Sequence, residues 1–212
     1  MKLFILGLPG SGKSAVARYL QAYLASFGLS TVRFNDYGIL YQMYQHDRDG
    51  LFQHAEPGGF DVVNIVAFDL ALRRLEELIK TYQEQAQHEF IIIEFSRNDY
   101  KRALSQFSSA FLEDACFLYL GTSVKECQQR IAKRAITKDY PADDYPISEY
   151  IFDKYYDRDD GNQLLPFLKN ELGIDEQRIR IFENAGTIEE LYQVVKDFTQ
   201  QIIEVRVPAL MR

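Results

Sequence analysis

The stretch GLPGSGKS, from Gly7 to Ser14, satisfies the complete pattern G-x-x-x-x-G-K-S/T. Glycines in this pattern let successive backbone N–H groups converge on phosphate oxygens, while Lys13 offers a positive charge to the β and γ phosphates and Ser14 offers a hydroxyl ligand to Mg²⁺. The apolar run KLFILG precedes the stretch and a helical pattern follows it, which is the strand, loop and helix order that such a loop needs. An ordinary glycine-rich turn would not explain why lysine and serine occupy these two places.

The sequence therefore predicts a phosphate-binding loop that holds a nucleotide. Its expected contacts are Gly7, Pro9, Gly10, Ser11, Gly12, Lys13, Ser14 and Ala15. The helix that begins here adds the positive end of its dipole to the anion site. The Lys13 side chain is expected to face solvent in the empty loop and to meet phosphate only when a nucleotide binds.

The composition is that of an acidic globular protein. The 212 residues carry a formal net charge of −7, and 47% of them are hydrophobic, so we expect a single domain over residues 1–212. The negative charge disfavours nucleic acids and membrane surfaces as partners, because both are polyanionic. No stretch approaches the roughly 18 apolar residues of a membrane span, and no cleavable signal pattern is present, so a cytoplasmic location is expected. Cys116 and Cys127 are expected to fill core or helix positions rather than to form a disulfide.

Five short apolar runs alternate with helical patterns along the chain. The runs cover residues 2–7, 30–34, 90–95, 115–121 and 178–182. Strands separated by helices imply right-handed crossovers, and therefore an α/β fold with a mostly parallel sheet and helices on both faces. The clearest helical pattern begins at residue 61 and continues to residue 82. Thr187 and Glu190 have the spacing of a capping box that opens the last helix.

Charged residues follow the second and third runs, at the sheet edge where the phosphate-binding loop lies. Asp36 follows residues 30–34, and Glu94 and Arg97 lie at the end of the run 90–95. A carboxylate that takes the proton of a phosphate acceptor assists phosphoryl transfer, and both carboxylates are candidates. The preferred assignment makes Asp36 the base and Glu94, with Ser14, the metal-side ligand. Helix N-capping is an equal alternative for Asp36, and Arg97 is a candidate ion-pair partner for Glu94.

Two irregular segments interrupt the pattern of strands and helices. Residues 37–60 are aromatic and polar, and they suit an insertion that binds the acceptor. Residues 137–160 contain seven aspartates and five tyrosines, and they suit a lid or flap, because the aspartates lack the spacing of a calcium loop. Arg130 and Arg134 lie one turn apart on the helical stretch before this segment. Both arginines are expected to function in the lid. The simpler alternative is that they are solvated residues on the helix surface.

Three motifs resemble the nucleoside-monophosphate-kinase-like group of P-loop kinases, which also includes shikimate, gluconate and polynucleotide kinases. The motifs are GLPGSGKS, FLYLGTSVKECQQRIAKR and IRIFENAGTIEEL. The resemblance implies the P-loop NTPase fold with sheet order 2-3-1-4-5, and it makes Arg130 and Arg134 lid arginines. It also implies that the adenine ring is contacted by Asn184, Ala185, Gly186 and Thr187. The Asp-Gly-x-Pro-Arg motif of adenylate kinase is absent, and this chain has EFSR in its place, which is similar to the Glu-Arg-Ser of deoxynucleoside kinases.

These features favour an ATP-dependent kinase that moves the γ-phosphoryl group of Mg·ATP to a small-molecule, nucleoside or nucleotide acceptor. A nucleotide-binding regulatory NTPase or switch protein is the first alternative. A polynucleotide end kinase is the second alternative. Such an enzyme needs a basic channel, which the acidic composition of this chain does not indicate. ATP is expected in preference to GTP, since no guanine-recognition motif follows a strand.

Overall fold

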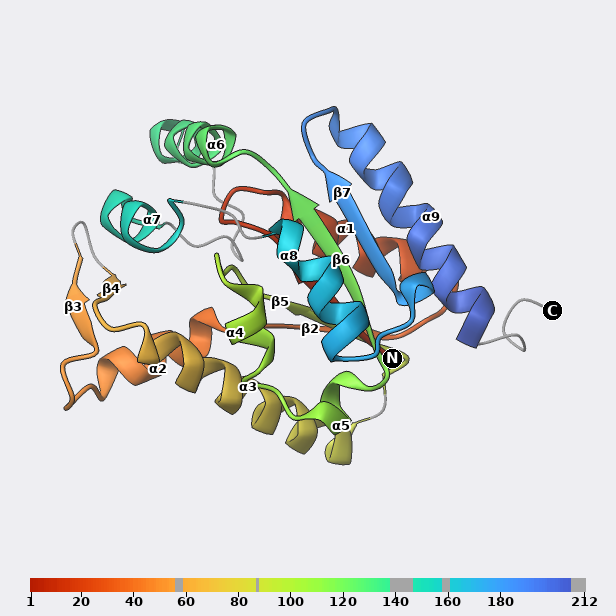
Figure 1. The fold of residues 1–212 in the computed structure, drawn as a ribbon, viewed down its shortest axis with the longest axis horizontal. Helices are drawn as coiled ribbons and strands as arrows, with labels where there is room; N and C mark the ends of the chain where they lie inside the picture. Colours follow the sequence, from red (N-terminus) through yellow and green to blue (C-terminus); the bar gives the residue numbers. More distant parts are fainter. Residues whose placement is uncertain (56–58, 87, 138–146, 158–160, 207–212) are drawn as a thin grey trace.

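A parallel sheet forms the centre of the protein, seen in a computed structural model that describes residues 1–55, 59–86, 88–137, 147–157 and 161–206 (Figure 1). Its five strands are β1 (Lys2–Leu6), β2 (Thr31–Asn35), β5 (Phe90–Glu94), β6 (Ala115–Gly121) and β7 (Ile179–Glu183). They lie in the order β2-β5-β1-β6-β7, and every neighbouring pair is parallel. Counted in chain order within this sheet, the order is 2-3-1-4-5, so the α/β fold and the expected strand order are confirmed.

Helices cover both faces of the sheet because alternate residues of each buried strand point to opposite sides. Leu3 and Ile5 of β1 pack with α1 (Lys13–Ala25) and α9 (Ile188–Arg206). Phe4 and Leu6 of β1 belong to the core of the opposite face. That face is covered by α3 (Val66–Gln85), α4 (Tyr100–Leu104), α5 (Ser109–Leu112), α8 (Gly161–Pro166) and the π-helical turn η1 (Phe167–Glu171). Cys116 and Cys127 are both buried and not disulfide-bonded, as expected.

Local side-chain contacts set where several helices begin. The predicted capping box opens α9, because the Thr187 N–H donates to Glu190 Oε2 at 2.9 Å and the Glu190 N–H donates to Thr187 Oγ1 at 3.2 Å. The long helix expected from residue 61 begins later, at Val66. The preceding residues pair in a strand instead, and the Asn64 side chain accepts a hydrogen bond of 3.0 Å from the Val66 N–H.

The segment after β2 forms a small unit of its own beside the sheet (Figure 1). It contains α2 (Tyr37–Gln45) and an antiparallel hairpin of β3 (Phe52–His54) and β4 (Phe60–Val62). The Phe60 ring packs against Tyr37, Tyr41 and Tyr44, with ring centroids 5.3–6.2 Å apart. This aromatic cluster holds the hairpin on α2, so residues 37–62 add a wall to the edge of the sheet.

Helix α6 (Val124–Thr137) leads into the predicted lid, and helix α7 (Glu149–Tyr155) lies within it. Residues 138–146 and 158–160 of the lid lie outside the described residues. A short 3₁₀ turn, η2 (Glu176–Arg178), leads into β7. Within the described part of the chain, every helix is too short or too polar to span a membrane.

Candidate active site

The phosphate-binding loop joins β1 to α1 through a backbone that requires glycine. Gly10 has φ +84° and Gly12 has φ +103°, both in the left-handed region. A Cβ atom on Gly10 would lie 2.8 Å from the Cys127 carbonyl oxygen of α6. The loop is therefore shaped both by its own φ angles and by close contact with the neighbouring helix, and side chains at these positions would displace it.

Lys13 is buried, contrary to the expectation that its side chain faces solvent. Its Nζ donates a hydrogen bond of 2.8 Å to the Leu8 carbonyl oxygen, and the residue is only 8% exposed. Burial lowers the pKa of the Lys13 ammonium to about 8, although the nearby carboxylate of Glu94 opposes the shift. The loop itself thus supplies a hydrogen-bond acceptor for Lys13, and phosphate oxygens that bind this lysine would have to replace it.

Glu94 lies next to Ser14, but its ion-pair partner is Arg33 and not Arg97. Ser14 Oγ is 3.4 Å from Glu94 Oε2, and Arg33 Nε donates to Glu94 Oε1 at 2.5 Å. The register explains this correction. Asn35 of β2 lies opposite Glu94 of β5, so Arg33, two residues earlier, projects from the same face of the sheet.

Ser14 and Glu94 are the residues that could hold Mg²⁺. A hydroxyl and a carboxylate side by side are the oxygen ligands that this ion accepts. Among the described residues there is no cluster of three or more His, Cys, Asp or Glu side chains able to bind a metal. At phosphoryl-transfer sites Mg²⁺ usually takes its remaining ligands from phosphate oxygens and water.

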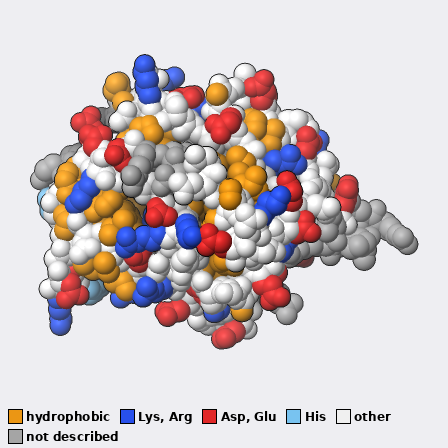
Figure 2. Space-filling model, viewed as in Figure 1, with side chains coloured by type: hydrophobic (Ala, Val, Ile, Leu, Met, Phe, Trp, Pro, Cys, Tyr) orange, Lys and Arg blue, Asp and Glu red, His pale blue; other side chains and the backbone are white. Residues whose placement is uncertain are grey.

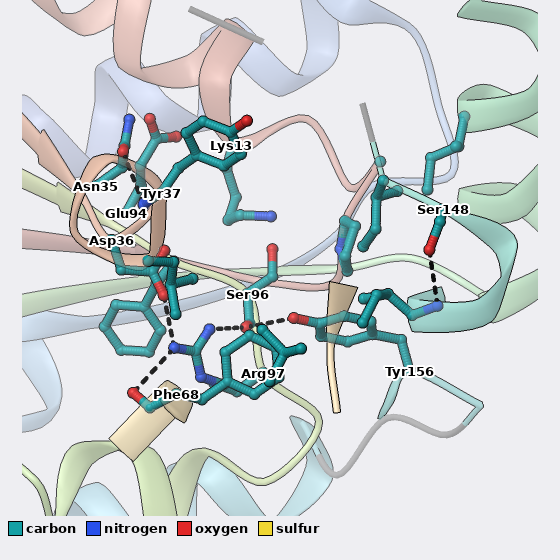
Figure 3. Close-up of a pocket in the computed structure, with 18 of the residues that line it drawn as sticks. Lys13, Asn35, Asp36, Tyr37, Phe68, Glu94, Ser96, Arg97, Ser148 and Tyr156 are labelled. Carbon is teal, nitrogen blue, oxygen red and sulfur yellow. Dashed lines mark hydrogen bonds and ion pairs between the residues drawn. The ribbon is translucent and has the colours of Figure 1, made fainter. Parts of the chain in front are cut away.

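Asp36 and Arg97 form a buried ion pair in the pocket that Lys13 and Ser14 also line (Figure 3). Arg97 Nη2 lies 2.5 Å from Asp36 Oδ2, Nη1 donates to the Ser96 carbonyl oxygen at 2.5 Å, and the guanidinium group lies 4.2 Å from the centre of the Phe68 ring. Burial alone would lower the pKa of Arg97, but the adjacent Asp36 carboxylate contributes to holding it above its ordinary value.

The alternative of helix capping by Asp36 is wrong. Asp36 occupies the N-cap position of α2, yet its carboxylate makes no capping hydrogen bond there. Asn35 supplies the side-chain contact instead, since its Oδ1 accepts from the Tyr37 N–H at 3.1 Å. Because a neighbour satisfies the helix end, the Asp36 carboxylate is directed to Arg97 and to the cavity.

Two tyrosine hydroxyls fix the loop that carries Arg97. The buried Tyr100 hydroxyl accepts from the Gly7 N–H at 2.7 Å and from the Arg97 N–H at 3.3 Å. The Tyr156 hydroxyl donates to the Ser96 carbonyl oxygen at 3.0 Å, and burial raises the pKa of this tyrosine to about 12. The Tyr100 side chain therefore connects the phosphate-binding loop with the segment that carries Arg97.

Arg130 and the Asn184 loop hold the phosphate-binding loop through its carbonyl oxygens. Arg130 donates to the carbonyl oxygens of Gly10 at 3.4 Å and Asn184 at 3.1 Å, and it also contacts Glu126. Asn184 Nδ2 donates to the Ser11 carbonyl oxygen at 2.8 Å. The structure thus brings together the two motifs that the sequence assigned to the lid and to adenine, and Asn184 is buried against the loop. Ala185, Gly186 and Thr187 are exposed beside it.

A cavity of about 220 Å³ extends from the phosphate-binding loop past the Asp36–Arg97 pair (Figure 3). Of the predicted site residues, its lining includes Pro9, Gly10, Lys13, Ser14, Asp36, Glu94, Arg97 and Arg134. The predicted contacts outside this lining are Gly7, Ser11, Gly12, Ala15, Arg130 and Asn184 to Thr187.

The fold, though not a sequence family, connects this chain to known proteins. No family model matches the sequence, and no curated protein matches it either. The APS kinase of Mycobacterium tuberculosis, solved with AMPPNP and APS, superposes with a TM-score of 0.53 at 15% identity, over 94% of this chain and 96% of that one. The chain has the fold of P-loop kinases.

Two further P-loop kinases superpose over almost their whole length. An unliganded sugar kinase from Janibacter sp. has a TM-score of 0.52 at 13% identity, over 99% of this chain and 96% of that one. Shikimate kinase from Acinetobacter baumannii, solved with shikimate, has a TM-score of 0.50 at 14% identity, over 97% and 94%. The resemblance seen in the sequence motifs thus extends to the fold.

Several residues of the site were missed by the sequence analysis. They are Arg33, Phe60, Asp61, Phe68, Tyr100 and Tyr156. Alternation along residues 30–35 could have placed Arg33 on the same face as Asn35. The others reach the site from a hairpin and from helices whose pairing no local pattern indicates.

Proposed function

We propose that this protein transfers the γ-phosphoryl group of Mg·ATP to a hydroxyl group of a small molecule. The observation that carries the proposal is that Lys13 and Ser14 of the phosphate-binding loop line the same cavity as Asp36 and Arg97. A cavity that continues past the phosphates has room for a second substrate, which a nucleotide switch does not need. The P-loop kinase fold supports the same class of reaction.

In this proposal Lys13 leaves the Leu8 carbonyl and binds the β and γ phosphates. Ser14 and Glu94 hold Mg²⁺, which neutralises charge on the phosphate oxygens when bound. The acceptor oxygen forms a bond to the γ phosphorus, the bond from that phosphorus to the bridging oxygen breaks, and ADP leaves. Asp36 receives the proton of the acceptor hydroxyl, and Arg97 keeps the carboxylate in place.

Asp36 suits the role of base better than Glu94, the alternative that the sequence left open. Glu94 is engaged by Arg33 and lies beside Ser14, on the side of the phosphates. Asp36 is farther along the cavity, where the acceptor has to lie. Arg134 lines the cavity and precedes the proposed lid in the chain, and in this proposal it brings positive charge to the phosphates. The Asn184 to Thr187 loop is the proposed adenine contact.

A polynucleotide end kinase has less support. On the face seen in Figure 2, acidic and basic side chains lie interspersed and do not form a continuous basic stripe. Single-stranded nucleic acids are bound in positively charged grooves. A compact acceptor is therefore the preferred partner.

The test compares Asp36→Asn with Glu94→Gln in a coupled ADP assay that contains a panel of acceptors. Asp36→Asn should lower kcat by about 10² to 10⁴-fold while ATP affinity stays close to wild type. Glu94→Gln should raise the Mg²⁺ concentration needed for half-maximal activity, because it removes a charged ligand of the ion. Asp69→Asn is the matched control, since Asp69 pairs with Arg102 outside the cavity. Unchanged kcat in the Asp36 variant would refute its role as base, and ADP formation that no acceptor stimulates would refute the kinase.

A further inference from the structure

The two ends of the cavity differ in charge. Two cations, Lys13 and Arg134, and one carboxylate, Glu94, line the end at the phosphate-binding loop. At the other end, the described side chains that carry charge are Asp36, Arg97 and Asp61. An ATP polyanion suits the first end. The second end has one cation and two carboxylates, and this sets the chemistry of the acceptor.

Both terminal nitrogens of Arg97, the cation at the acceptor end, are already engaged. Arg97 Nη2 binds Asp36 at 2.5 Å and also approaches the Phe68 carbonyl oxygen at 3.4 Å, while Nη1 binds Ser96. The Phe68 ring covers one face of the guanidinium group. A phosphate or carboxylate of an acceptor would have to displace Asp36 and leave that carboxylate buried without its cation, which is costly.

Asp61 adds a negative charge, and among the described side chains its hydrogen-bond donors are neutral. This residue of β4 is 6% exposed and lines the cavity. Its Oδ1 accepts from the Ser148 hydroxyl at 2.6 Å, and its Oδ2 lies 3.4 Å from Gln53 Nε2. Within the described residues, no lysine or arginine pairs with it. An anionic group entering here meets like charge, whereas hydroxyl and amino groups meet an acceptor of hydrogen bonds.

Aromatic side chains form the rest of this end. Tyr37 and Phe60 line it with ring centroids 5.6 Å apart, and the Phe68 ring lies against Arg97. Flat apolar walls of this kind bind rings through their faces and exclude water. The site thus combines ring surfaces with two carboxylates.

We infer that the phosphate acceptor is an uncharged, ring-bearing alcohol, such as a nucleoside or a neutral cyclic polyol, which carries no phosphate or carboxylate group. The inference rests on the proposed function and narrows its acceptor. The hydroxyl to be phosphorylated approaches Asp36, and another hydroxyl or amino group of the same molecule donates to Asp61. Nucleoside monophosphates and sugar acids are excluded by charge.

The test measures acceptor binding by calorimetry with the full chain saturated by Mg·AMPPNP. Ligands are used in matched pairs that share a ring and differ in one acidic group, namely nucleosides with their monophosphates and neutral hexoses with their uronic acids. At least one neutral member should bind, and its acidic counterpart should bind roughly tenfold more weakly or worse. Equal or tighter binding of the acidic members, or binding by none of the neutral ones, would overturn the inference.

Asp61→Asn provides the variant arm, because the amide keeps an oxygen for the Ser148 hydroxyl and removes the charge. It should reduce the discrimination against acidic ligands, while Asp69→Asn, outside the cavity, should leave it unchanged. Unaltered discrimination in Asp61→Asn would count against the role of Asp61. ATP turnover with the same ligands separates the two proposals. Neutral ligands that bind without being phosphorylated contradict the kinase only, and efficient phosphorylation of acidic ones contradicts only the inference.

Discussion

The hydroxyl group of Tyr100 accepts a hydrogen bond of 2.7 Å from the backbone N–H of Gly7, the first residue of the phosphate-binding loop. The same oxygen accepts from the Arg97 N–H at 3.3 Å. The buried Tyr100 side chain therefore sets the position of the phosphate-binding loop relative to the segment that carries Arg97, the partner of Asp36. In the proposed kinase, the distance between ATP and the acceptor would depend on this connection.

Tyr100→Phe should weaken both stability and nucleotide binding. The substitution keeps the ring but leaves two buried N–H groups without their acceptor, which costs about 1–3 kcal/mol for each such group in proteins. Urea unfolding and calorimetric titration with Mg·ATP measure the two effects. Tyr150→Phe is the control, because the Tyr150 hydroxyl accepts from Lys154 at an exposed site. If both variants match the wild type, the connection is dispensable.

Lys13→Met should stabilise the nucleotide-free protein at neutral pH while it abolishes turnover. Burial lowers the pKa of Lys13 from 10.5 to about 8, so keeping the lysine charged in the folded state costs roughly 3 kcal/mol at pH 7. The loss of the hydrogen bond to Leu8 reduces the net gain of the variant. Chemical unfolding of both proteins at pH 7 gives the comparison.

The stability difference between Lys13→Met and the wild type should become smaller as the pH rises. Between pH 8 and 10.5 the unfolded chain holds a proton on Lys13 that the folded chain has lost, so the stability contributed by this residue rises with pH. The advantage of Lys13→Met should therefore shrink across this range. An advantage that stays constant or grows from pH 7 to pH 10 would contradict the buried lysine.

Gly10→Ala should impair nucleotide binding more than backbone strain alone explains. A methyl group at Gly10 meets the Cys127 carbonyl oxygen at 2.8 Å, whereas one at Gly50 has no atom within 4 Å. Both glycines have positive φ, +84° and +67°, so each alanine bears a comparable strain of about 1–2 kcal/mol. Mg·ATP affinity should fall in Gly10→Ala only. Equal affinity in the two variants would argue that the loop tolerates displacement by α6.

Arg130→Ala and Arg134→Ala should have different effects. Arg130 holds the Gly10 and Asn184 carbonyl oxygens, so its loss should weaken ATP binding. Arg134 lines the cavity, and its loss should lower kcat by up to about 10³-fold with a smaller change in ATP affinity. Steady-state kinetics beside direct ATP titration separates the two. A wild-type kcat in Arg134→Ala would contradict this role and indicate that Arg134 is a solvated helix residue.

The main sheet and the phosphate-binding loop were predictable because their signals are local. KLFILG followed by GLPGSGKS fixes a buried strand, a tight loop and a helix start within fourteen residues, and the alternation of apolar runs with helices leaves few topologies. The edge position of Asp36, Glu94 and Arg97 followed from the same reasoning. These residues lie at strand ends, which parallel strands bring together.

The pairing of side chains at that edge was not predictable in the same way. Arg97 was a candidate ion-pair partner for Glu94. The register of β2 with β5 instead brings Arg33 to Glu94, and Arg97 pairs with Asp36. The hairpin of β3 and β4 has strands of three residues each, too short to show a period. Its position depends on the Phe60 cluster and on Asp61 binding Ser148, contacts between distant parts of the chain.

The most direct test of the central claim follows the γ-phosphate itself. Protein with Mg·ATP labelled in the γ-phosphate is incubated with a mixture of uncharged ring-bearing alcohols, and the products are separated. The account predicts label in an acceptor, in a reaction that Lys13→Met and Asp36→Asn both suppress. Label found only in inorganic phosphate, at a rate that acceptors do not change, would contradict it.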